Sequence, residues 1–291
     1  MKYPRLTHKL MCEPWCVTEA MHASMVDILA AHVEGKSVMT DFQKPDVAKA
    51  DSNSGPYGSV RVPDTGGALS KRGKLGIITL EGVMGTKLSW MEEMCGGCSI
   101  EALQAAIESA YNDPTIARVL FDISSPGGTA CGTPETAGMV ADLSRKKETF
   151  SASIDICGSA AQWVAAQCRT SYGTTNGTYG SIGCFIAKLD LSKQREMEGE
   201  NLQIIRGGKY KAMGMDAPLT DDERALLQAI VDENTEAFRN DVRAGRERFA
   251  KKKVSDETMQ GQIFSGTQAI QNGLLDALVP SIISIVRSLS A

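Results

Sequence analysis

The sequence predicts an α/β fold with a largely parallel sheet and flanking helices. Three short apolar runs bounded by turn formers are typical of buried strands, at residues 75–80, 119–123 and 150–156. Segments with helical periodicity lie between and after these strands, at residues 99–112, 133–146 and 159–167. Strands that alternate with helices in this way favour a parallel sheet, whose ligand sites lie at the carboxyl ends of the strands.

Residue patterns define the individual elements. The helix at 99–112 has one apolar face, formed by Ile100, Leu103, Ala106, Ile107 and Ala110. Thr220 and Glu223 form a capping box, in which a hydroxyl and a carboxylate satisfy free backbone donors at the start of a helix. The apolar stripe of the long helix that follows consists of Leu226, Leu227, Ile230, Val231, Ala237, Phe238 and Val242. The basic run at 246–253 is interpreted as a solvated helix end, and residues 264–279 as a short helix closed by Gly273 and followed by a strand.

Composition divides the 291 residues into three parts. Residues 1–35 have helical periodicity, with Met21, Met25, Ile28, Leu29 and His32 on one face, and are expected to form an N-terminal helical appendage for docking. Residues 36–73 are rich in turn formers and poor in apolar residues, which predicts a flexible linker. Residues 74–291 are expected to form the α/β domain.

Composition also excludes several classes of function. The chain is 42% hydrophobic and 23% charged, with a formal net charge of -4, so it is globular and lacks the basic surface of a nucleic-acid-binding protein. No apolar run is long enough to span a membrane, which predicts a soluble, cytoplasmic protein. The only histidines are His8, His22 and His32, so a histidine base would have to come from the N-terminal segment. No cofactor and no metal are expected.

The eight cysteines are expected to be reduced thiols, because the chain opens without a secretory signal. Cys95 and Cys98 have the spacing of a redox or zinc pair, and Cys12 with Cys16 could complete a zinc site only if distant segments meet. We interpret Cys95 and Cys98 as loop cysteines.

Three loops contain residues that could carry chemistry. Asp122–Gly128 has paired glycines after a strand, which suits backbone amides that stabilise an oxyanion. In Tyr179–Gly183 two glycines flank Ser181 and leave its hydroxyl accessible. In Gly207–Gly214 two lysines lie between glycines, and a lysine can act as a general base where burial lowers its pKa. Taken singly, each loop is better explained as an ordinary turn, and its lysines as exposed loop residues.

Taken in order, the loops resemble a known family. Asp-x-x-Ser-Pro-Gly-Gly, a small-residue helix, Gly-Ser-Ile-Gly and Gly-Lys-x-Lys-x-x-Gly resemble the signal peptide peptidase (protease IV) superfamily of serine peptidases. Within it, the chain is most similar to the bacteriophage head-maturation (prohead) proteases, or minor capsid protein C. Further segments support that branch, namely Glu13-Pro-Trp15, residues 219–224 and residues 264–276. The similarity covers residues 75–280 and implies a Clp protease/crotonase-like fold.

The resemblance also implies roles for individual residues. Ser181 corresponds to the nucleophile and Lys211 to the general base of a Ser-Lys dyad. Gly127 and Gly128 correspond to the oxyanion donors, joined by the amide of Ser181. Ser159 and Lys209 are secondary candidates, since Ser159 lies where Clp proteases have their nucleophile. The implied reaction is hydrolysis of a peptide bond through an acyl-enzyme.

The phage branch implies particular partners. Its substrates would be scaffold and capsid-assembly proteins inside a prohead in the host cytoplasm. A homo-oligomeric ring is expected, with sites completed by neighbouring subunits, and the N-terminal segment is expected to contact a portal or shell. Two alternatives remain: a catalytically inactive capsid-assembly protein that retains the fold, and a crotonase-like acyl-CoA enzyme that uses carboxylic acids in place of a Ser-Lys pair.

Overall fold

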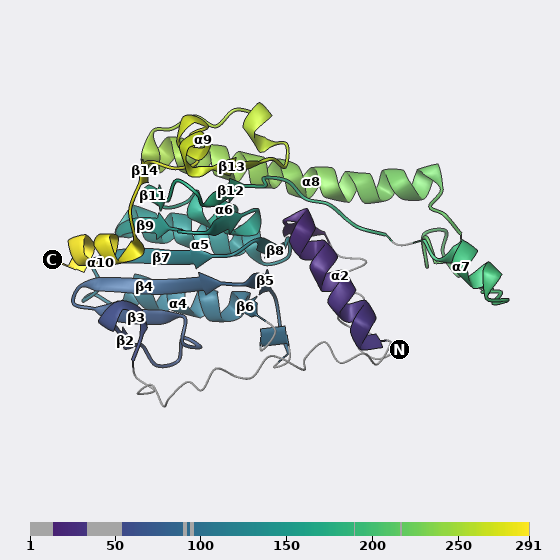
Figure 1. Ribbon diagram of the computed structural model, residues 1–291, viewed down its shortest axis with the longest axis horizontal. Coiled ribbons are helices and arrows are strands. Elements are labelled where there is room, and N and C mark those ends of the chain that lie inside the picture. Colours follow the sequence, from purple (N-terminus) through teal and green to yellow (C-terminus); the bar gives the residue numbers. More distant parts are fainter. Residues whose placement is uncertain are drawn as a thin grey trace.

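The computed structural model of the chain describes residues 14–33, 54–89, 92–93, 96–188, 190–215 and 217–290. A seven-stranded sheet lies at the centre of the described part, in the order β14-β11-β9-β7-β4-β3-β2 (Figure 1). The strands from β14 to β4 are parallel, and β3 and β2 continue the sheet in antiparallel fashion. Their bounds are β2 Val60–Arg61, β3 Leu69–Arg72, β4 Leu75–Glu81, β7 Arg118–Ser124, β9 Glu148–Ala152, β11 Thr170–Gly173 and β14 Ala277–Leu278.

Two smaller sheets contain the segments that follow the carboxyl ends of the large sheet's parallel strands. One has the order β1-β8-β5-β6, and the other has the order β10-β12-β13. Their strands are β1 Trp15–Val17, β5 Val83–Gly85, β6 Gly97–Ser99, β8 Gly127–Thr129, β10 Ile156–Gly158, β12 Thr178–Gly180 and β13 Ile263–Ser265. A bridge between Ser125, in the loop before β8, and Cys157 of β10 connects the two small sheets. The segments that follow β7 and β9 therefore meet where these sheets adjoin.

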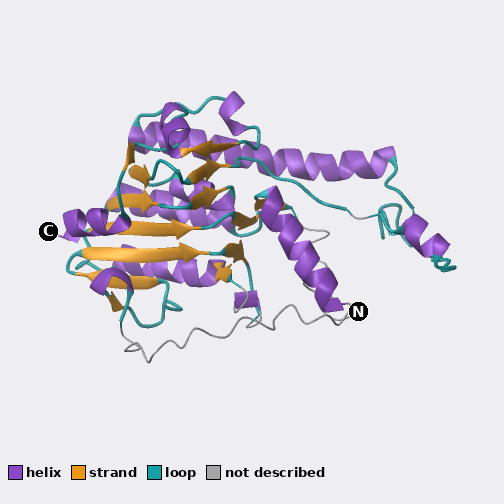
Figure 2. Cartoon of the chain, viewed as in Figure 1, coloured by secondary structure: helices purple, strands orange, loops and turns teal. Residues whose placement is uncertain are grey.

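Helices cover both faces of the large sheet, as Figure 2 shows. The helices of the described residues are α2 Glu19–Val33, α4 Ile100–Asn112, α5 Thr133–Lys146, α6 Ala160–Ala165, α7 Ser192–Met197, α8 Asp221–Gly245, α9 Gly266–Gln271 and α10 Ile282–Ser290, of which α2 and α7 lie away from the large sheet. Side chains of β4 alternate between the two faces. Ile78 and Leu80 belong to the core cluster that includes residues of α4, α5, α6 and α8, whereas Leu75 and Ile77 belong to the cluster that includes residues of α10. Burial on both faces explains why β4 is a nearly continuous apolar run.

The predicted α/β class with a mostly parallel sheet is confirmed. The helix α5 has the predicted bounds, and α4 starts one residue later than predicted because Ser99 caps it by accepting a hydrogen bond from the amide of Ala102 (3.2 Å). All five residues of the predicted apolar face of α4 are buried. The capping box at Thr220 and Glu223 is present.

Two predictions were wrong in detail. The expected strand at 150–156 ends at Ala152, and the chain turns before β10 because the carboxylate of Asp155 accepts hydrogen bonds from the amide of Ile156 (2.6 Å) and the hydroxyl of Ser124 (2.6 Å). The basic run at 246–253 does not begin as a solvated helix end. Arg246 is 0% exposed, and its guanidinium is bonded to Asp276 (2.8 Å).

The N-terminal part takes part in two sheets. Residues 1–13 and 34–53 lie outside the described residues. Of the rest, β1 pairs with β8, and β2 and β3, inside the stretch predicted to be a linker, extend the large sheet. The division at residue 74 stays a prediction. No helix in the described ranges is both long enough and apolar enough to cross a membrane.

The long helix α8 packs against the core near its C-terminal end. Phe238 stacks on Trp163 with ring centroids 4.3 Å apart, and the indole N–H of Trp163 donates to Asp241 (2.9 Å). The N-terminal half extends away from the sheets (Figure 2). There the predicted stripe residues Leu226 and Ile230 are 39% and 37% exposed.

Candidate active site

The glycine loop after β7 leads directly into β8, which lies between β1 and β5. Only glycine fits at two positions of β8. A Cβ on Gly127, whose φ is +106°, would lie 2.1 Å from the carbonyl oxygen of Cys16, and a Cβ on Gly128 would lie 2.0 Å from that of Met84. The paired glycines therefore allow two neighbouring strands to approach the backbone of β8 closely.

Ser181 follows β12 directly and lies half-buried on a turn of unusual conformation. Its φ is +54°, a region that residues with a side chain seldom adopt, and it follows Gly180 with a φ of +108°. Its amide donates to the carbonyl of Gln262 (2.7 Å), which continues the pairing of β12 with β13. Strained backbone held by surrounding structure is common at functional sites.

Ser159 lies next to both loops. Its amide donates to the carbonyl of Gly180 (2.7 Å), and its Cβ would be 2.9 Å from a Cβ on Gly127. Its backbone is strained, with φ 51° and ψ -118°, and it immediately precedes α6. Its hydroxyl is fully buried and has no hydrogen-bond partner. The structure thus brings the β8 glycines, Ser159 and the loop of Ser181 together.

The three amides expected to stabilise an oxyanion have partners within the chain. The amide of Gly127 donates to the hydroxyl of Ser125 (3.2 Å), and that of Ser181 to Gln262. Gly128 pairs with Cys16 of β1. The hydrogen bonds Ala130 N to Pro14 O (3.1 Å) and Thr18 N to Pro126 O (3.1 Å) flank this pair. In an antiparallel ladder, that alternation makes Cys16 and Gly128 a hydrogen-bonded pair.

Sequence reasoning missed the role of β1. It treated residues 1–35 as one helical appendage, although Trp15, Cys16 and Val17 are all buried in the small sheet. A run of three apolar residues after Pro14 was the available signal. Such a short run does not identify its partner, because the pairing with β8 joins residues more than a hundred positions apart.

The two lysines lie far from Ser181. The amide of Cys184, three residues after Ser181, donates to the hydroxyl of Thr235 (3.2 Å) in the middle of α8. Lys209 forms an ion pair with Asp222 at the N-terminal end of that helix. From Asp222 to Thr235 the helix rises about 20 Å at about 1.5 Å per residue. The structure therefore does not bring Lys211, which is exposed in the same turn as Lys209, to Ser181.

The two lysines differ in their surroundings. The hydrogen bond and the charge of Asp222 raise the pKa of Lys209, which favours its protonated form. A general base must be able to lose its proton, so this partner makes Lys209 the poorer candidate. Lys211 is held through its backbone, with its amide donating to the carbonyl of Gly208 (3.0 Å).

Two other titratable groups near the loops, His22 and Asp122, contact neighbouring side chains. His22 is buried, and its ring contacts the rings of Trp15 and Phe185 at 5.9 and 5.0 Å between centroids. Asp122 opens the glycine loop. Burial raises the pKa of its carboxyl, and the hydrogen bond from the hydroxyl of Tyr57 (2.8 Å) acts in the opposite direction.

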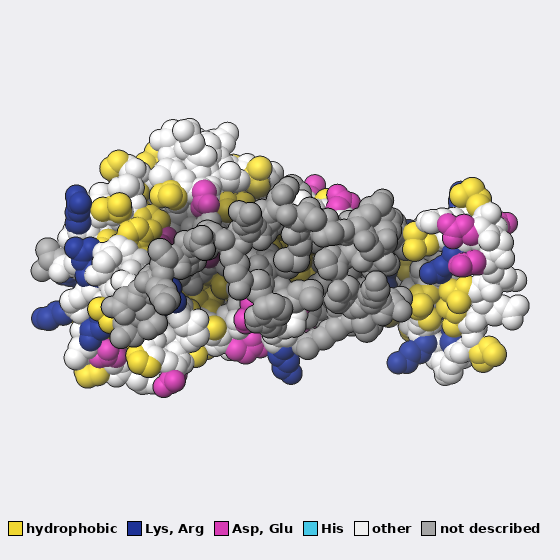
Figure 3. Space-filling model, turned by 60° about the horizontal axis from the view of Figure 1, so that its bottom comes forward, with side chains coloured by type: hydrophobic (Ala, Val, Ile, Leu, Met, Phe, Trp, Pro, Cys, Tyr) yellow, Lys and Arg dark blue, Asp and Glu magenta, His cyan; other side chains and the backbone are white. Residues whose placement is uncertain are grey.

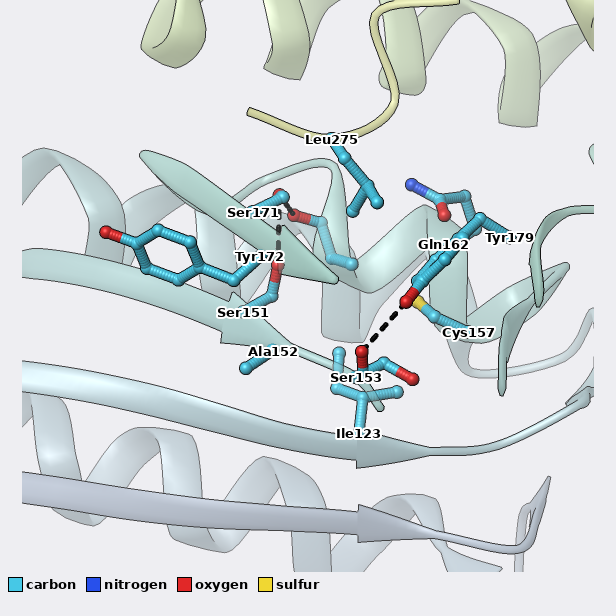
Figure 4. Close-up of a pocket in the computed structure, with 11 residues that line it drawn as sticks. Ile123, Ser151, Ala152, Ser153, Cys157, Gln162, Ser171, Tyr172, Tyr179 and Leu275 are labelled. Carbon is cyan, nitrogen blue, oxygen red and sulfur yellow. Dashed lines mark hydrogen bonds between the residues drawn. The ribbon is translucent and has the colours of Figure 1, made fainter. Parts of the chain in front are cut away.

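A small internal cavity lies beneath the site, between β9, β11 and α6 (Figure 4). Its volume is about 10 Å³, and its walls include Ser151 and Ser171, joined by a hydrogen bond of 2.9 Å, and Tyr179, which donates to the carbonyl of Ser153 (2.9 Å). Gln162 also lines it, and neither amide atom of that side chain has a partner. This space holds about one water molecule at most, so it cannot accept a substrate.

Of the four cysteines on which the zinc interpretation depends, the structure describes Cys16 and Cys98. Cys12 and Cys95 lie outside the described residues. Burial raises the pKa of the Cys98 thiol to about 11, which favours the unreactive protonated form. Within the described ranges, no three His, Cys, Asp or Glu side chains are grouped as a metal site requires.

Comparisons with known proteins agree with the resemblance inferred from the loops. The chain is 32% identical over 180 residues to a protein of Synechocystis sp. whose name describes it as a protease, covering 62% of this chain and 62% of the relative. It is 26% identical over 208 residues to the capsid assembly protease C of Escherichia phage lambda, covering 71% of this chain and 47% of the relative. It is 25% identical over 213 residues to the head-tail preconnector protein of Enterobacteria phage P21, covering 70% and 40%.

These matches span less than two thirds of each relative's own length. Among solved structures, an enoyl-CoA hydratase/isomerase family member aligns with a TM-score of 0.40 and 14% identity, covering 76% of this chain and 75% of that chain. Residues 141–283, which include Ser159, Ser181 and both lysines, match the sequence model of peptidase family S49. This part of the chain therefore matches a peptidase S49 domain, and the relatives of the chain include a phage capsid assembly protease and a phage head-tail preconnector protein.

Proposed function

We propose that the protein is a serine endopeptidase in which Ser181 is the nucleophile and Lys211 of a neighbouring copy is the general base. The observation that carries the proposal is the position of Ser181. It lies in an S49 domain, on a strained turn flanked by glycines, next to the buried glycines of β8. Accessibility favours Ser181 over Ser159, because Ser181 is half-buried and the hydroxyl of Ser159 is fully buried.

In the proposed reaction, the hydroxyl oxygen of Ser181 attacks the carbonyl carbon of a peptide bond as the neutral amine of Lys211 accepts its proton. The amides of Gly127, Gly128 and Ser181 exchange their present partners for the developing oxyanion. The lysine ammonium then protonates the leaving amine, and an acyl-enzyme forms on Ser181. The same amine then accepts a proton from a water molecule, whose oxygen attacks the acyl carbon. The ester bond to Ser181 breaks, and the lysine ammonium returns the proton to the Ser181 oxygen.

A neighbouring copy is needed because Lys211 lies roughly 20 Å from the loop of Ser181 along α8. The arm that carries it, residues 190–215, exposes several large apolar side chains among charged ones, and Figure 3 shows apolar patches beside basic and acidic ones at that end of the molecule. Met197 is 83% exposed and Ile205 is 102% exposed, and Leu226 and Ile230 of α8 are also exposed. Packing these side chains against another copy would remove them from water and could also bury Lys211, as a lysine base requires.

The phage relatives support a substrate class. Their names place them in capsid assembly and at the head-tail connection. We propose scaffold and capsid-assembly proteins as the substrates, the assembling prohead as the site of action, a homo-oligomeric ring as the active form, and contact of the N-terminal segment with a portal or shell.

A fluorophosphonate probe tests the proposal directly. We expect one adduct per site on Ser181, located by peptide mass spectrometry on the full chain, because the probe reacts only with an activated serine. The variant Ser159→Ala serves as the matched control and should be labelled as fast as the unmodified chain. An adduct on Ser159 would move the nucleophile there. No adduct on any serine in the assembled protein would favour the inactive assembly protein or the crotonase-like enzyme.

The pH profile of cleavage identifies the base. A rate that still rises above about pH 8 is expected for a lysine base, whereas a histidine base with the ordinary pKa of its side chain would give a rate that levels off at about pH 7 to 8. Initial rates of cleavage of a peptide substrate, measured from about pH 6 to about pH 10 in steps of about one pH unit, distinguish a lysine base from a histidine base. His22→Phe, which keeps an aromatic ring between Trp15 and Phe185, should leave the profile unchanged.

A further inference from the structure

The strand β1 is held from both sides. On one side it pairs with β8, and on the other Trp15 and Phe185 exchange both backbone hydrogen bonds (2.9 and 3.0 Å). Phe185 lies four residues after Ser181. A segment from the N-terminal part of the chain thus lies between the glycine strand and the loop of Ser181, where Figure 1 shows β8 next to the start of α2.

This pairing places two cysteines opposite each other. Because Trp15 and Phe185 form a hydrogen-bonded antiparallel pair, the next pair, Cys16 and Cys184, is a non-hydrogen-bonded one. The amide of Cys184 agrees, since it points away from β1 and donates to Thr235. Residues at such positions typically have Cα atoms about 4.5 Å apart, within the range of about 4.4 to 6.8 Å that a disulfide requires. The two sulfur atoms are 2.8 Å apart.

From this geometry we propose that Cys16 and Cys184 are a redox modification site, at which a low-molecular-weight disulfide forms a reversible cross-strand disulfide that fixes β1 between β8 and the loop of Ser181. The two residues are 168 positions apart in the chain, so the bond would join the N-terminal segment to the candidate active site. All six described cysteines are free thiols, and Cys16 and Cys184 are the pair whose sulfur atoms are in contact.

The surroundings define the order of the chemistry. Cys16 is fully buried, whereas Cys184 is partly exposed. Hydrogen bonds from the thiol of Cys16 and from Thr235 lower the pKa of Cys184, against the effect of burial, and the same contact together with burial raises the pKa of Cys16. Cys184 is therefore the thiolate that a small reagent meets first.

The reaction balances as two thiol–disulfide exchanges. The Cys184 thiolate attacks one sulfur of the reagent, the S–S bond of the reagent breaks, and one reagent thiolate leaves. The thiol of Cys16 then loses its proton and attacks the Cys184 sulfur of the mixed disulfide, which releases the second reagent thiolate. Two protein thiols are oxidised, one reagent disulfide is reduced to two thiols, and an excess of a dithiol reverses the process.

Oxidation would have a consequence for β1. Cys16 is also the residue that pairs with Gly128, so a fixed β1 would keep its carbonyl on that amide. Under the proposed function, on which this step rests, the Gly128 amide would then be withheld from a substrate carbonyl. Reduction would allow β1 to separate from β8.

The test uses the full chain, incubated with oxidised or reduced glutathione, alkylated and digested. We expect a cross-linked peptide that contains Cys16 and Cys184 in the oxidised sample only, and its loss after treatment with dithiothreitol. Cys157 and Cys168 are matched controls, since both are buried thiols whose pKa burial raises, and they should stay reduced. Alkylated Cys16 and Cys184 in the oxidised sample, with the exposed Cys131 modified, would overturn the proposal.

Hydrogen exchange then tests whether β1 is fixed. The amides of residues 15–17 should exchange at least about tenfold more slowly after oxidation, and Cys16→Ser should remove the difference. Equal exchange in both states would overturn the effect on β1. Slower labelling of Ser181 after oxidation is expected as well. If Ser181 is unlabelled even in the reduced chain while the disulfide forms, the proposed function fails and the redox site stands.

Discussion

Mixing two inactive variants is expected to restore cleavage. Ser181→Ala and Lys211→Ala should each reduce the rate by about 10⁶-fold, the loss typical of removing a member of a catalytic unit that acts together. If serine and lysine come from adjacent copies, random mixed oligomers contain sites in which both residues are intact. For equal amounts, such sites are about a quarter of the total, so the mixture should recover about a quarter of the original rate. Cleavage of a peptide substrate before and after subunit exchange measures this recovery.

Two controls make that result decisive. Lys209→Ala should retain activity within about twofold, because the exposed ion pair of Lys209 with Asp222 contributes little. Thermal unfolding should show that the two inactive variants are folded, since Lys211 is exposed and Ser181 donates to the carbonyl of Gln262 through its backbone amide. Mixed samples that exchange subunits but stay inactive would contradict a dyad shared between copies. Loss of activity in Lys209→Ala, with Lys211→Ala active, would assign the base to Lys209.

Local patterns predicted the elements whose determinants lie within one turn or one face. The capping box of Thr220 and Glu223 and the apolar face of α4 need only residues three or four positions apart, and both are present. The glycines of β8 were also identified from the sequence, because the close approach of other backbone to Gly127 and Gly128 requires residues without a side chain.

Features that depend on distant segments could not be predicted in this way. The pairing of β1 with β8 and Phe185 joins three separate parts of the chain, and no periodicity reports it. The position of Lys211 depends on how far α8 extends, and the apolar stripe of α8 looked the same where it is buried at Phe238 and where it is exposed at Leu226. A stripe that covers another copy has the same spacing as one that covers the chain's own core.

Arg246 illustrates the same limit, since only the folded structure distinguishes it from the other basic residues of its run. Its guanidinium donates to both carboxylate oxygens of Asp276 (2.8 and 3.1 Å), to the carbonyl of Gly273 (2.8 Å) and to the hydroxyl of Ser171 (3.2 Å). Asp276 also accepts from the amide of Ser171 (2.7 Å). This cluster joins the end of α8 to β11 and to the segment before β14.

Removing one partner of this cluster is expected to destabilise the protein strongly. Asp276→Ala should reduce the free energy of unfolding by about 3 to 5 kcal/mol, because it leaves a charged guanidinium buried without its counter-ion. Replacing both partners by apolar residues, as in Arg246→Met with Asp276→Leu, removes the uncompensated charge and should cost much less than the two single changes added together. Urea unfolding of the single and double variants measures the coupling between the two sites.

The matched control is the exposed pair of Arg243 and Asp256, one turn before Arg246 in the same region of the chain. Asp256→Ala should change the free energy of unfolding by at most about 1 kcal/mol, because water solvates the arginine that remains. A similarly small effect of Asp276→Ala would mean that water reaches Arg246 in solution. Additive effects of the single changes at Arg246 and Asp276 would mean that the two side chains do not interact, against the paired hydrogen bonds that join them.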